Sequence, residues 1–288
     1  MRKQKLYALA QDITPPILFK FIKRTRFYSF LKKIFDKFNE SSVAKVVVVE
    51  TGPLQGLSLK FNPDGAWQQQ MLSGTYDKEI LEIVTKLSLT DKTIYDIGAH
   101  IGIHSLLFAK LVGKDGAVHG FEPNQYNAER FKEIVTLNPE LSSIIHVHQL
   151  ALGEEVGETM FLSNNDLEGG SSTGGFVDKA NTIWKREVYL EQTGFTPTPV
   201  KQDTVDNLVD SQTTKPPALL KIDVEGAEQL VLEGARKTIL THKPVIIIEL
   251  HSIFSAYDCM RILRELNYST KVLHKEEDGR VIIFASTT

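Results

Sequence analysis

The stretch IYDIGAHIGIHSLLFA, residues 94–109, decides the fold of this chain. Its apolar start ends on an acid, Asp96, and two glycines follow at positions 98 and 102. Apolar residues then recur at helical spacing. The stretch therefore predicts a buried strand that stops on a carboxylate and enters a helix through a glycine turn.

The alternation of strand and helix continues outward from this unit. We expect strands at 93–97, 117–122, 144–150, 218–223 and 244–250, helices at 102–112, 125–137, 226–240 and 255–266, and two closing strands at 270–274 and 280–285. This order predicts an α/β fold with an open, mostly parallel sheet, helices on both faces and an antiparallel edge. The pattern fails between 163 and 200, where a glycine- and serine-rich segment predicts a mobile lid over the acceptor pocket.

Two sections precede this region, which we take as a domain spanning 93–288. Residues 46–92 contain two short strands and a helix at 77–87, and we expect this lead-in to cap the cofactor site. Residues 1–45 form a basic extension, in which apolar residues recur at helical spacing from Phe27 to Phe38. A helix of this kind within residues 17–38 suits either an anionic membrane surface or packing against the body or a second subunit.

Charge is divided unevenly along the chain. Residues 1–40 hold ten Lys and Arg and three acids, a net +7, so the total of −3 leaves −10 for the remainder. A body this acidic argues against nucleic acid as a partner, because phosphate binding needs a basic face. The single cysteine, Cys259, excludes an internal disulfide. We read no membrane-spanning run and no secretory signal, so we expect a cytoplasmic protein, with peripheral attachment to the inner face of a membrane as the alternative.

The glycine turn also bears on the ligand. The row from Asp96 to Gly102 lacks the middle glycine of the dinucleotide fingerprint G-x-G-x-x-G, and it carries an acid two residues before its first glycine. A carboxylate there would repel a pyrophosphate but would suit a ligand with an ammonium group. S-adenosylmethionine has an amino acid tail, a sulfonium and no phosphate, and it is the cofactor that we predict.

Glu122 gives independent support for a nucleoside ligand. It ends the second strand of this region, about 20 residues after the glycine turn, where an acid accepts hydrogen bonds from ribose hydroxyls. A solvated acid at a strand end is the alternative for this residue taken alone. Paired with the turn at 96–102, it favours a bound nucleoside.

Together these segments resemble the FkbM-type S-adenosylmethionine-dependent methyltransferases. The matching stretches are YDIGAHIGIHSLLFA, GFEPN, HQLALGEEVGE, LLKIDVEGAEQLVLEGA and KPVIIIELH, preceded by GPLQGLSLKF and SGTYDKEI. The resemblance implies a class I methyltransferase fold, which is Rossmann-like, with seven strands of which the last is antiparallel. It also implies methyl transfer, usually to oxygen, in saccharides or other natural products.

By position, the resemblance places Asp96, Gly98 and Gly102 beside the methionine moiety and Glu122 at the ribose. It further implies that Tyr76 closes over the cofactor. The remaining cofactor contacts that it implies come from the glycine turn, from the residues after Glu122 and from the end of the third strand: Ala99, Pro123, Asn124, Gln149, Ala151 and Leu152.

The stretch LLKIDVEGAE, residues 219–228, carries the candidate chemistry. Its strand ends at Asp223, at the same carboxyl edge as Asp96, where an acceptor would meet the methyl group. Methylating an alcohol requires the loss of a proton, which a positioned carboxylate can accept. Asp223 or Glu225 is our candidate base, with helix capping and backbone hydrogen bonding as the structural alternative. We expect Glu228 to be an exposed helix residue.

His251 is a further candidate base, because its ordinary pKa suits neutral pH. It follows the strand at 244–250 and points to the same side as Glu249. With Asp223 these two residues could offer a metal site of oxygen and nitrogen ligands. Because the Asp-Asn pair of metal-dependent small-molecule methyltransferases is missing, we expect no metal. We expect His146 and His148 to pack on a sheet face.

The predicted function is an S-adenosylmethionine-dependent O-methyltransferase that acts on a hydroxyl of a saccharide, glycolipid or secondary metabolite. One alternative is an NAD(P)-dependent oxidoreductase on a Rossmann-like fold. The glycine spacing and the absence of a Tyr-Lys or cysteine nucleophile constellation argue against it. The other is a non-catalytic binding protein that retains the fold. Three acids at one sheet edge, Asp96, Glu122 and Asp223, argue against that alternative.

Overall fold

The computed structural model describes residues 45–61, 66–73, 75–163, 175–180, 195–276 and 279–287. They belong to a compact unit that spans Lys45–Thr288, and Met1–Ala44 form a second unit. The lead-in and the region after residue 92 are therefore parts of one unit. The amphipathic helix predicted within 17–38 lies outside the described residues. Among the described helices, none combines the length and apolar character that crossing a membrane would require.

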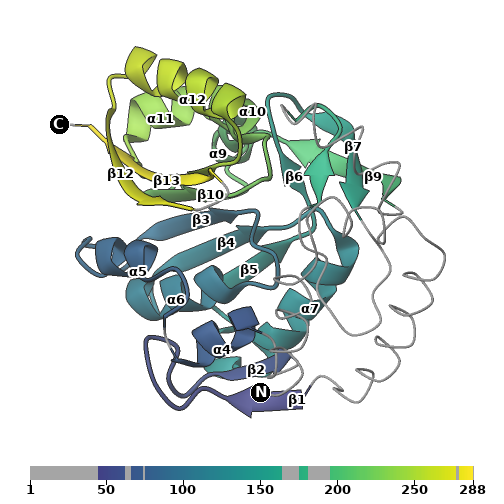
Figure 1. The fold of residues 1–288 in the computed structure, drawn as a ribbon, viewed down its shortest axis with the longest axis vertical. Helices are drawn as coiled ribbons and strands as arrows, with labels where there is room; N and C mark the ends of the chain where they lie inside the picture. Colours follow the sequence, from purple (N-terminus) through teal and green to yellow (C-terminus); the bar gives the residue numbers. More distant parts are fainter. Residues whose placement is uncertain are drawn as a thin grey trace, which may run out of the picture. The chain divides into compact units, whose positions relative to one another are not determined.

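A seven-stranded sheet lies at the centre, with the strand order β12-β13-β11-β10-β3-β4-β5 (Figure 1). The strands are β3 (Thr93–Ile97), β4 (Ala117–Phe121), β5 (Ile145–His148), β10 (Leu219–Ile222), β11 (Val245–Leu250), β12 (Ser269–Lys275) and β13 (Val281–Ser286). The strands from β11 to β5 pair in parallel. β13 runs antiparallel to both of its neighbours. The antiparallel strand thus lies one place in from the edge, because β12 pairs with its outer side.

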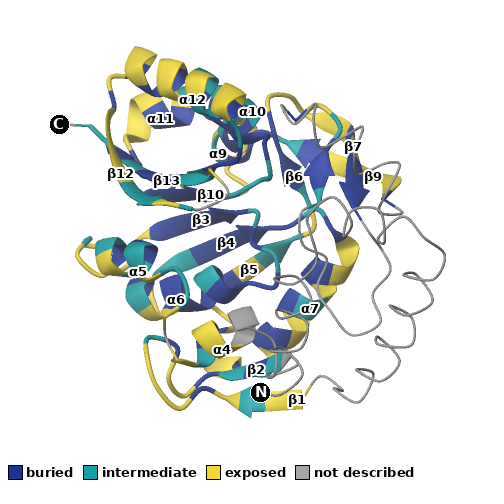
Figure 2. Ribbon diagram, in the orientation of Figure 1, coloured by how far each residue is buried: buried dark blue, intermediate teal, exposed yellow. Residues whose placement is uncertain are grey.

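Helices cover both faces of this sheet (Figure 1). One face carries α5 (Lys78–Val84), α6 (Ile103–Val112) and α7 (Gln125–Thr136), and the other carries α9 (Val205–Asp210), α10 (Glu228–Glu233), α11 (Arg236–His242) and α12 (Ile253–Glu265). Successive strand residues supply opposite cores, as a period of two requires: Ile94 joins one and Tyr95 the other. Figure 2 shows the buried sheet between helices whose outer sides are exposed.

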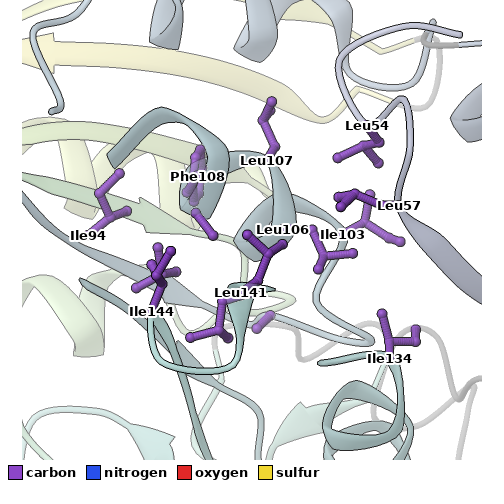
Figure 3. Close-up of a cluster of buried hydrophobic side chains, with 14 of the residues drawn as sticks. Leu54, Leu57, Ile94, Ile103, Leu106, Leu107, Phe108, Ile134, Leu141 and Ile144 are labelled. Atoms are coloured by element: carbon purple, nitrogen blue, oxygen red, sulfur yellow. The ribbon is translucent and has the colours of Figure 1, made fainter. Parts of the chain in front are cut away.

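Helix α6 is the centre of the first core. Leu106 and Phe108 are fully buried, and Figure 3 shows them among side chains from β3, from the segment after α7 and from the lead-in. Leu54 and Leu57 of the lead-in belong to the same cluster. Burying a side chain of this size stabilises a fold by about 1.5–3 kcal/mol. The lead-in therefore contributes to the core as well as standing over the sheet edge.

The helix expected over 226–240 is interrupted, forming α10 and α11. Gly234 lies at the break, and a Cβ atom there would come within 1.9 Å of the backbone oxygen of Gly153. Only glycine permits this backbone approach. The interruption therefore depends on a contact with a segment distant in sequence, which helical periodicity cannot predict.

Two smaller sheets complete the described chain. β1 (Lys45–Val48) pairs with β2 (Ser58–Phe61), and α4 (Ala66–Ser73) and a 3-10 turn, η1 (Pro139–Leu141), lie outside the sheets. The second small sheet has the order β6-β9-β7-β8 and consists of β6 (Ala151–Leu152), β7 (Gly157–Ser163), β8 (Phe176–Val177) and β9 (Thr196–Asp203). β8 and part of β9 thus lie where we expected an irregular lid.

Prolines explain why β9 escaped prediction. Pro197 and Pro199 pair only with β7, and β6 joins the other side of β9 at Gln202. A proline cannot donate a ladder hydrogen bond and is tolerated where a strand has an open edge. Residues 164–174 and 181–194, the rest of the expected lid, lie outside the described residues.

Three histidines stack on the face of β4 and β5. The ring of His119 lies 4.9 Å from that of His146 and 5.2 Å from that of His148, centroid to centroid. A hydrogen bond of 2.9 Å joins His119 Nδ1 and His148 Nε2. The expected sheet-face packing of His146 and His148 is confirmed.

Candidate active site

A cavity of about 570 Å³ opens at the carboxyl edge of the main sheet. Its lining follows the ends of β3, β4, β10 and β11, where Gly98, Glu122, Asp223 and Glu249 lie. The lead-in, the second small sheet and the connection between β12 and β13 supply the other walls, through residues that include Tyr76, Asp77, Ala151, Leu152, Gly175, Val177, Glu276 and Arg280. This volume is typical of a small-molecule site.

The glycine turn after β3 is held against the end of β10. Gly98 has φ +77, and a Cβ atom there would lie 1.8 Å from the backbone oxygen of Asp223. Ala99 and His100 follow it along the cavity wall. Gly102 begins α6 with φ +87, but it packs on the ring of Phe131 and does not line the cavity. Glycine is needed at this position of the turn because a Cβ atom would collide with the Phe131 ring.

Asp96 lies outside the cavity lining, although the resemblance placed it beside the methionine moiety. Its side chain is fully buried and accepts a 2.6 Å hydrogen bond from Ser105 Oγ. Its other oxygen, Oδ1, lies 3.3 Å from Lys221 Nζ. Asp96 thus contacts Lys221, which does line the cavity.

Lys221 is a site residue that sequence reasoning missed. Its Nζ lies 3.3 Å from each of Asp96 Oδ1, Asp223 Oδ2 and the backbone oxygen of Gly98. Burial alone would lower the pKa of Lys221, but the two carboxylates outweigh it and raise that pKa above its usual range. Burial acts to raise the pKa of Asp223, and Lys221 followed by His251 brings it below its usual value. The available signal was a lysine inside an apolar strand, in the row LLKID.

Glu122 is buried at the end of β4 and accepts two backbone hydrogen bonds. The N–H of His100 donates to Oε2 at 2.8 Å, and the N–H of Asn124 donates to Oε1 at 2.9 Å. Burial raises the pKa of Glu122 to about 7, against the effect of these two bonds. Pro123 lines the cavity beside it. Asn124 instead caps α7 through its side chain and lies outside the lining.

A second polar group comes from the lead-in and α6. Tyr76 lines the cavity and its ring lies 5.7 Å from that of His104. Asp77 Oδ2 lies 3.1 Å from His104 Nε2. Burial raises the pKa of Tyr76 above its usual range, so the phenol is neutral near pH 7. Asp77 and His104 both line the cavity and were not predicted as site residues.

A cluster of acids surrounds His251 at the ends of β10 and β11. Asp223, Glu225 and Glu249 line the cavity, whereas His251 lies behind them with its side chain 1% exposed. His251 Nε2 lies 3.5 Å from Asp223 Oδ1, 3.7 Å from Glu249 Oε1 and 3.8 Å from Glu225 Oε2. Burial would lower the pKa of His251, but Glu228 and the other acids raise it to about 9.

Glu228 corrects a prediction, because it is fully buried instead of exposed. Its carboxylate accepts hydrogen bonds from the Gly226 N–H at 2.7 Å, from His251 Nδ1 at 2.8 Å and from Ser255 Oγ. The start of α10 turns this side chain toward β11 and α12 and away from solvent. Helical periodicity alone could not fix that direction.

Three of the seven described non-glycine residues with positive φ line the cavity. They are Asp77, His100 and Glu225, with φ of 44°, 53° and 54°. Side chains other than glycine adopt this region at a cost, which functional sites commonly retain.

The predicted cofactor residues divide into two groups. Those that line the cavity are Tyr76, Gly98, Ala99, Glu122, Pro123 and Ala151, together with Leu152. Those that do not are Asp96, Gly102, Asn124 and Gln149. Gln149 is exposed, because it follows β5 at the open end of the sheet.

Comparison with known proteins identifies the family of this chain. The family model described as the methyltransferase FkbM domain matches residues 96–270, more than half of the chain. The hexuronic acid methyltransferase AglP of Haloferax volcanii is 24% identical over 214 residues, which cover 74% of this chain and 78% of that protein. The crystal structure of the methyltransferase FkbM from Methylobacillus flagellatus KT has the same fold, with a TM-score of 0.50 and 20% identity.

That match covers 70% of this chain and 45% of the Methylobacillus chain, so this chain spans less than half of that protein. The sheet-edge residues of the cavity, from Ile97 to Glu249, all fall within the region that the family model matches. The chain is a methyltransferase and belongs to the FkbM family.

Proposed function

We propose that this enzyme transfers the methyl group of S-adenosylmethionine to a hydroxyl oxygen of a saccharide, a glycolipid or a related natural product. The observation that carries the proposal is the charge of the cavity. Among the described residues, six Asp and Glu side chains line it: Asp77, Glu122, Asp223, Glu225, Glu249 and Glu276. Only two Lys and Arg side chains of that set, Lys221 and Arg280, line it with them. Such a lining suits a cationic ligand and disfavours the pyrophosphate of a dinucleotide.

The lining also offers groups that fit each part of S-adenosylmethionine. Glu122 is held by backbone donors and keeps acceptor capacity for ribose hydroxyls. Ala151, Leu152 and Phe161 form an apolar wall suited to an adenine ring. The acids at the ends of β10 and β11 suit the sulfonium and ammonium groups.

S-adenosylmethionine supplies an electrophilic methyl group bound to sulfur. In our proposal, Asp223 accepts a hydrogen bond from the acceptor hydroxyl and takes its proton as the oxygen–carbon bond forms and the carbon–sulfur bond breaks. Because Lys221 and His251 keep the pKa of Asp223 low, the carboxylate is a weak base whose main contribution is to orient the oxygen. Alignment of oxygen, carbon and sulfur then supplies much of the rate. Glu225 is the second candidate for the same role.

A saccharide acceptor is favoured by likeness to AglP, whose name records a hexuronic acid as its substrate. Glu276 and Arg280, from the connection of β12 and β13, are polar groups at the cavity that suit a hydroxylated acceptor. Attachment to a membrane or to a second copy through residues 17–38 stays a prediction. Co-sedimentation of liposomes with the full chain and with a chain lacking residues 1–44 tests it.

Calorimetry tests the cofactor. We expect S-adenosylhomocysteine to bind the full chain, and we expect no binding of NAD under the same conditions. Transfer of labelled methyl groups to hexuronic acid glycans then tests the acceptor class. Asp223→Asn should lower turnover by roughly 10²–10⁴-fold, with affinity for S-adenosylhomocysteine retained. Glu158→Gln, which changes an exposed acid outside the cavity, is the matched control. Binding of NAD without binding of S-adenosylhomocysteine would overturn the proposal.

A further inference from the structure

We propose that Asp223, Glu249 and His251 form a binding site for one divalent first-row metal ion at the acceptor end of the cavity. One ligand atom of each residue lies within 4.8 Å of the other two. The sequence led us to expect no metal, and the geometry of the cluster changes that expectation. The role of the ion in catalysis rests on the proposed function, whereas its binding does not.

The spacing of the ligand atoms is the first observation. His251 Nε2 lies 3.5 Å from Asp223 Oδ1 and 3.7 Å from Glu249 Oε1. These separations exceed the length of an N–H···O hydrogen bond, about 2.7–3.2 Å. Ligands that share one ion at bond lengths of about 2.0–2.4 Å stand roughly 3–4 Å apart. The two separations from His251 Nε2 therefore fall in the range that a shared ion produces.

The orientation of the imidazole is the second, independent observation. His251 Nδ1 donates to the buried carboxylate of Glu228 at 2.8 Å, and Gly226 N–H and Ser255 Oγ hold that carboxylate in turn. This bond leaves Nε2 aimed at the carboxylates that line the cavity. Among the described residues, no hydrogen bond forms at Nε2. A buried histidine that donates one N–H to a carboxylate and presents its other nitrogen is the usual arrangement at metal sites.

Three acids surround Nε2 at 3.5–3.8 Å and favour a proton on His251 when no ion is bound. An ion that binds Nε2 therefore displaces that proton and takes over its interaction with the acids. Lys221 approaches Asp223 through the opposite oxygen, Oδ2, which leaves Oδ1 facing the cluster. Arg280 donates to Glu249 Oε1, so an ion has to share or displace that contact.

The ligand set points to the kind of ion. Carboxylates suit Mn²⁺ and Mg²⁺, while an imidazole ligand favours transition metals over Mg²⁺. One imidazole with two carboxylates therefore favours an ion such as Mn²⁺. The third acid, Glu225, stands 3.8 Å from Nε2 and is placed to bind the ion or one of its waters. An ion held here would offer an open position to an acceptor hydroxyl oxygen.

Titration of the full chain with Mn²⁺ tests the site. The protein is treated with EDTA, dialysed and titrated without cofactor or acceptor, and free Mn²⁺ is followed by electron paramagnetic resonance. We expect one ion per chain. Asp223→Asn and Glu249→Gln should each weaken binding at least about 10-fold, since the loss of an outer-shell partner alone commonly costs that much, and Glu276→Gln should leave it unchanged. Pulsed spectra should carry nitrogen modulation from His251, which His251→Gln should abolish. Circular dichroism verifies that each variant is folded.

Three results would overturn the proposal: no Mn²⁺ bound at millimolar concentration, unchanged affinity in folded Glu249→Gln, or bound Mn²⁺ without nitrogen modulation. Because neither cofactor nor acceptor is present, such a result leaves the methyl-transfer proposal standing. Conversely, Mn²⁺ binding without any affinity for S-adenosylhomocysteine would overturn the proposed function alone. The two proposals therefore fail separately.

Discussion

Replacing Lys221 by methionine tests how far this buried cation stabilises the fold through the two carboxylates beside it, Asp96 and Asp223. Methionine is unbranched and of similar length, so the change removes a charge while still filling the space. Lys221 is 3% exposed, and its Nζ lies 3.3 Å from both Asp96 and Asp223. Without it, Asp96 would remain fully buried with the Ser105 hydroxyl as its hydrogen-bond donor.

The loss of stability expected in Lys221→Met depends on which carboxylate is left without a partner. Removing one member of a buried ion pair costs about 3–5 kcal/mol, because the other charge stays desolvated. The side chain of Asp223 is 29% exposed and also faces His251, so we assign most of the cost to Asp96. Adding Asp96→Asn to the Lys221→Met variant removes the isolated charge. The double variant should therefore recover at least about 2 kcal/mol of the free energy of unfolding.

Urea unfolding at neutral pH, followed by circular dichroism, measures these differences. Lys237→Met is the matched control, because Lys237 is exposed and pairs with Asp210 at the surface. Its loss should cost less than about 1 kcal/mol. A Lys221→Met variant that loses no more than this control would refute the reasoning. A double variant that is as unstable as the sum of the two single variants would do the same.

Three further predictions concern the turn, the histidine stack and the lead-in. Gly98→Ala should lower the free energy of unfolding by at least about 2 kcal/mol in thermal unfolding, because its Cβ would meet the Asp223 backbone oxygen. The same variant should abolish cofactor binding measured by calorimetry. Gly279 has φ +94 and open space around an added Cβ, so Gly279→Ala should cost about 1 kcal/mol. Burial lowers the pKa of His119 to about 3. As the pH falls below about 6.5, His119 therefore becomes protonated in the unfolded chain but stays neutral in the folded one. The stabilisation from this residue is fully present above about pH 6.5, and the free energy of unfolding should fall by about 2 kcal/mol by pH 5. In urea titrations, the free energy of unfolding of His119→Gln should differ less between pH 8 and pH 5 than that of the unchanged chain. The same pH difference in both proteins would contradict this prediction. Asn138→Ala removes two side-chain hydrogen bonds to the β2 backbone; it should cost about 1–3 kcal/mol and speed amide exchange in β2, and an unaltered exchange rate would count against it.

Much of the main sheet could be predicted because its signals are local. β3 occupies 93–97 as expected, and the other predicted strands of that sheet differ from the structure by one or two residues at their ends. Buried parallel strands read as short apolar runs between turn residues, and the connecting helices read as apolar residues at helical spacing. The break at Gly234 and the pairing of β9 could not be read, since each depends on a partner segment distant in sequence.

The candidate site, too, could be predicted only where its signals are local. Topology brings residues that follow parallel strands to one edge, which is why Gly98, Glu122 and Asp223 were found. Side-chain direction within that edge is not a local property. Asp96 precedes the glycine turn by two residues yet points beneath the cavity, and Glu228 turns inward from a short helix.

Two buried ion pairs decide which acids of this edge are left for a ligand. Asp96 is paired with Lys221, and Glu228 with His251, so both of these acids are withdrawn from the cavity. Both cations reach past their buried partners to Asp223: Lys221 faces one of its oxygens and His251 the other. The floor of the site therefore fixes the position of Asp223 from two sides and favours its ionised form. A carboxylate prepared in this way costs little to orient when an acceptor or a cation arrives, and such preorganisation is the main means by which a protein can assist methyl transfer.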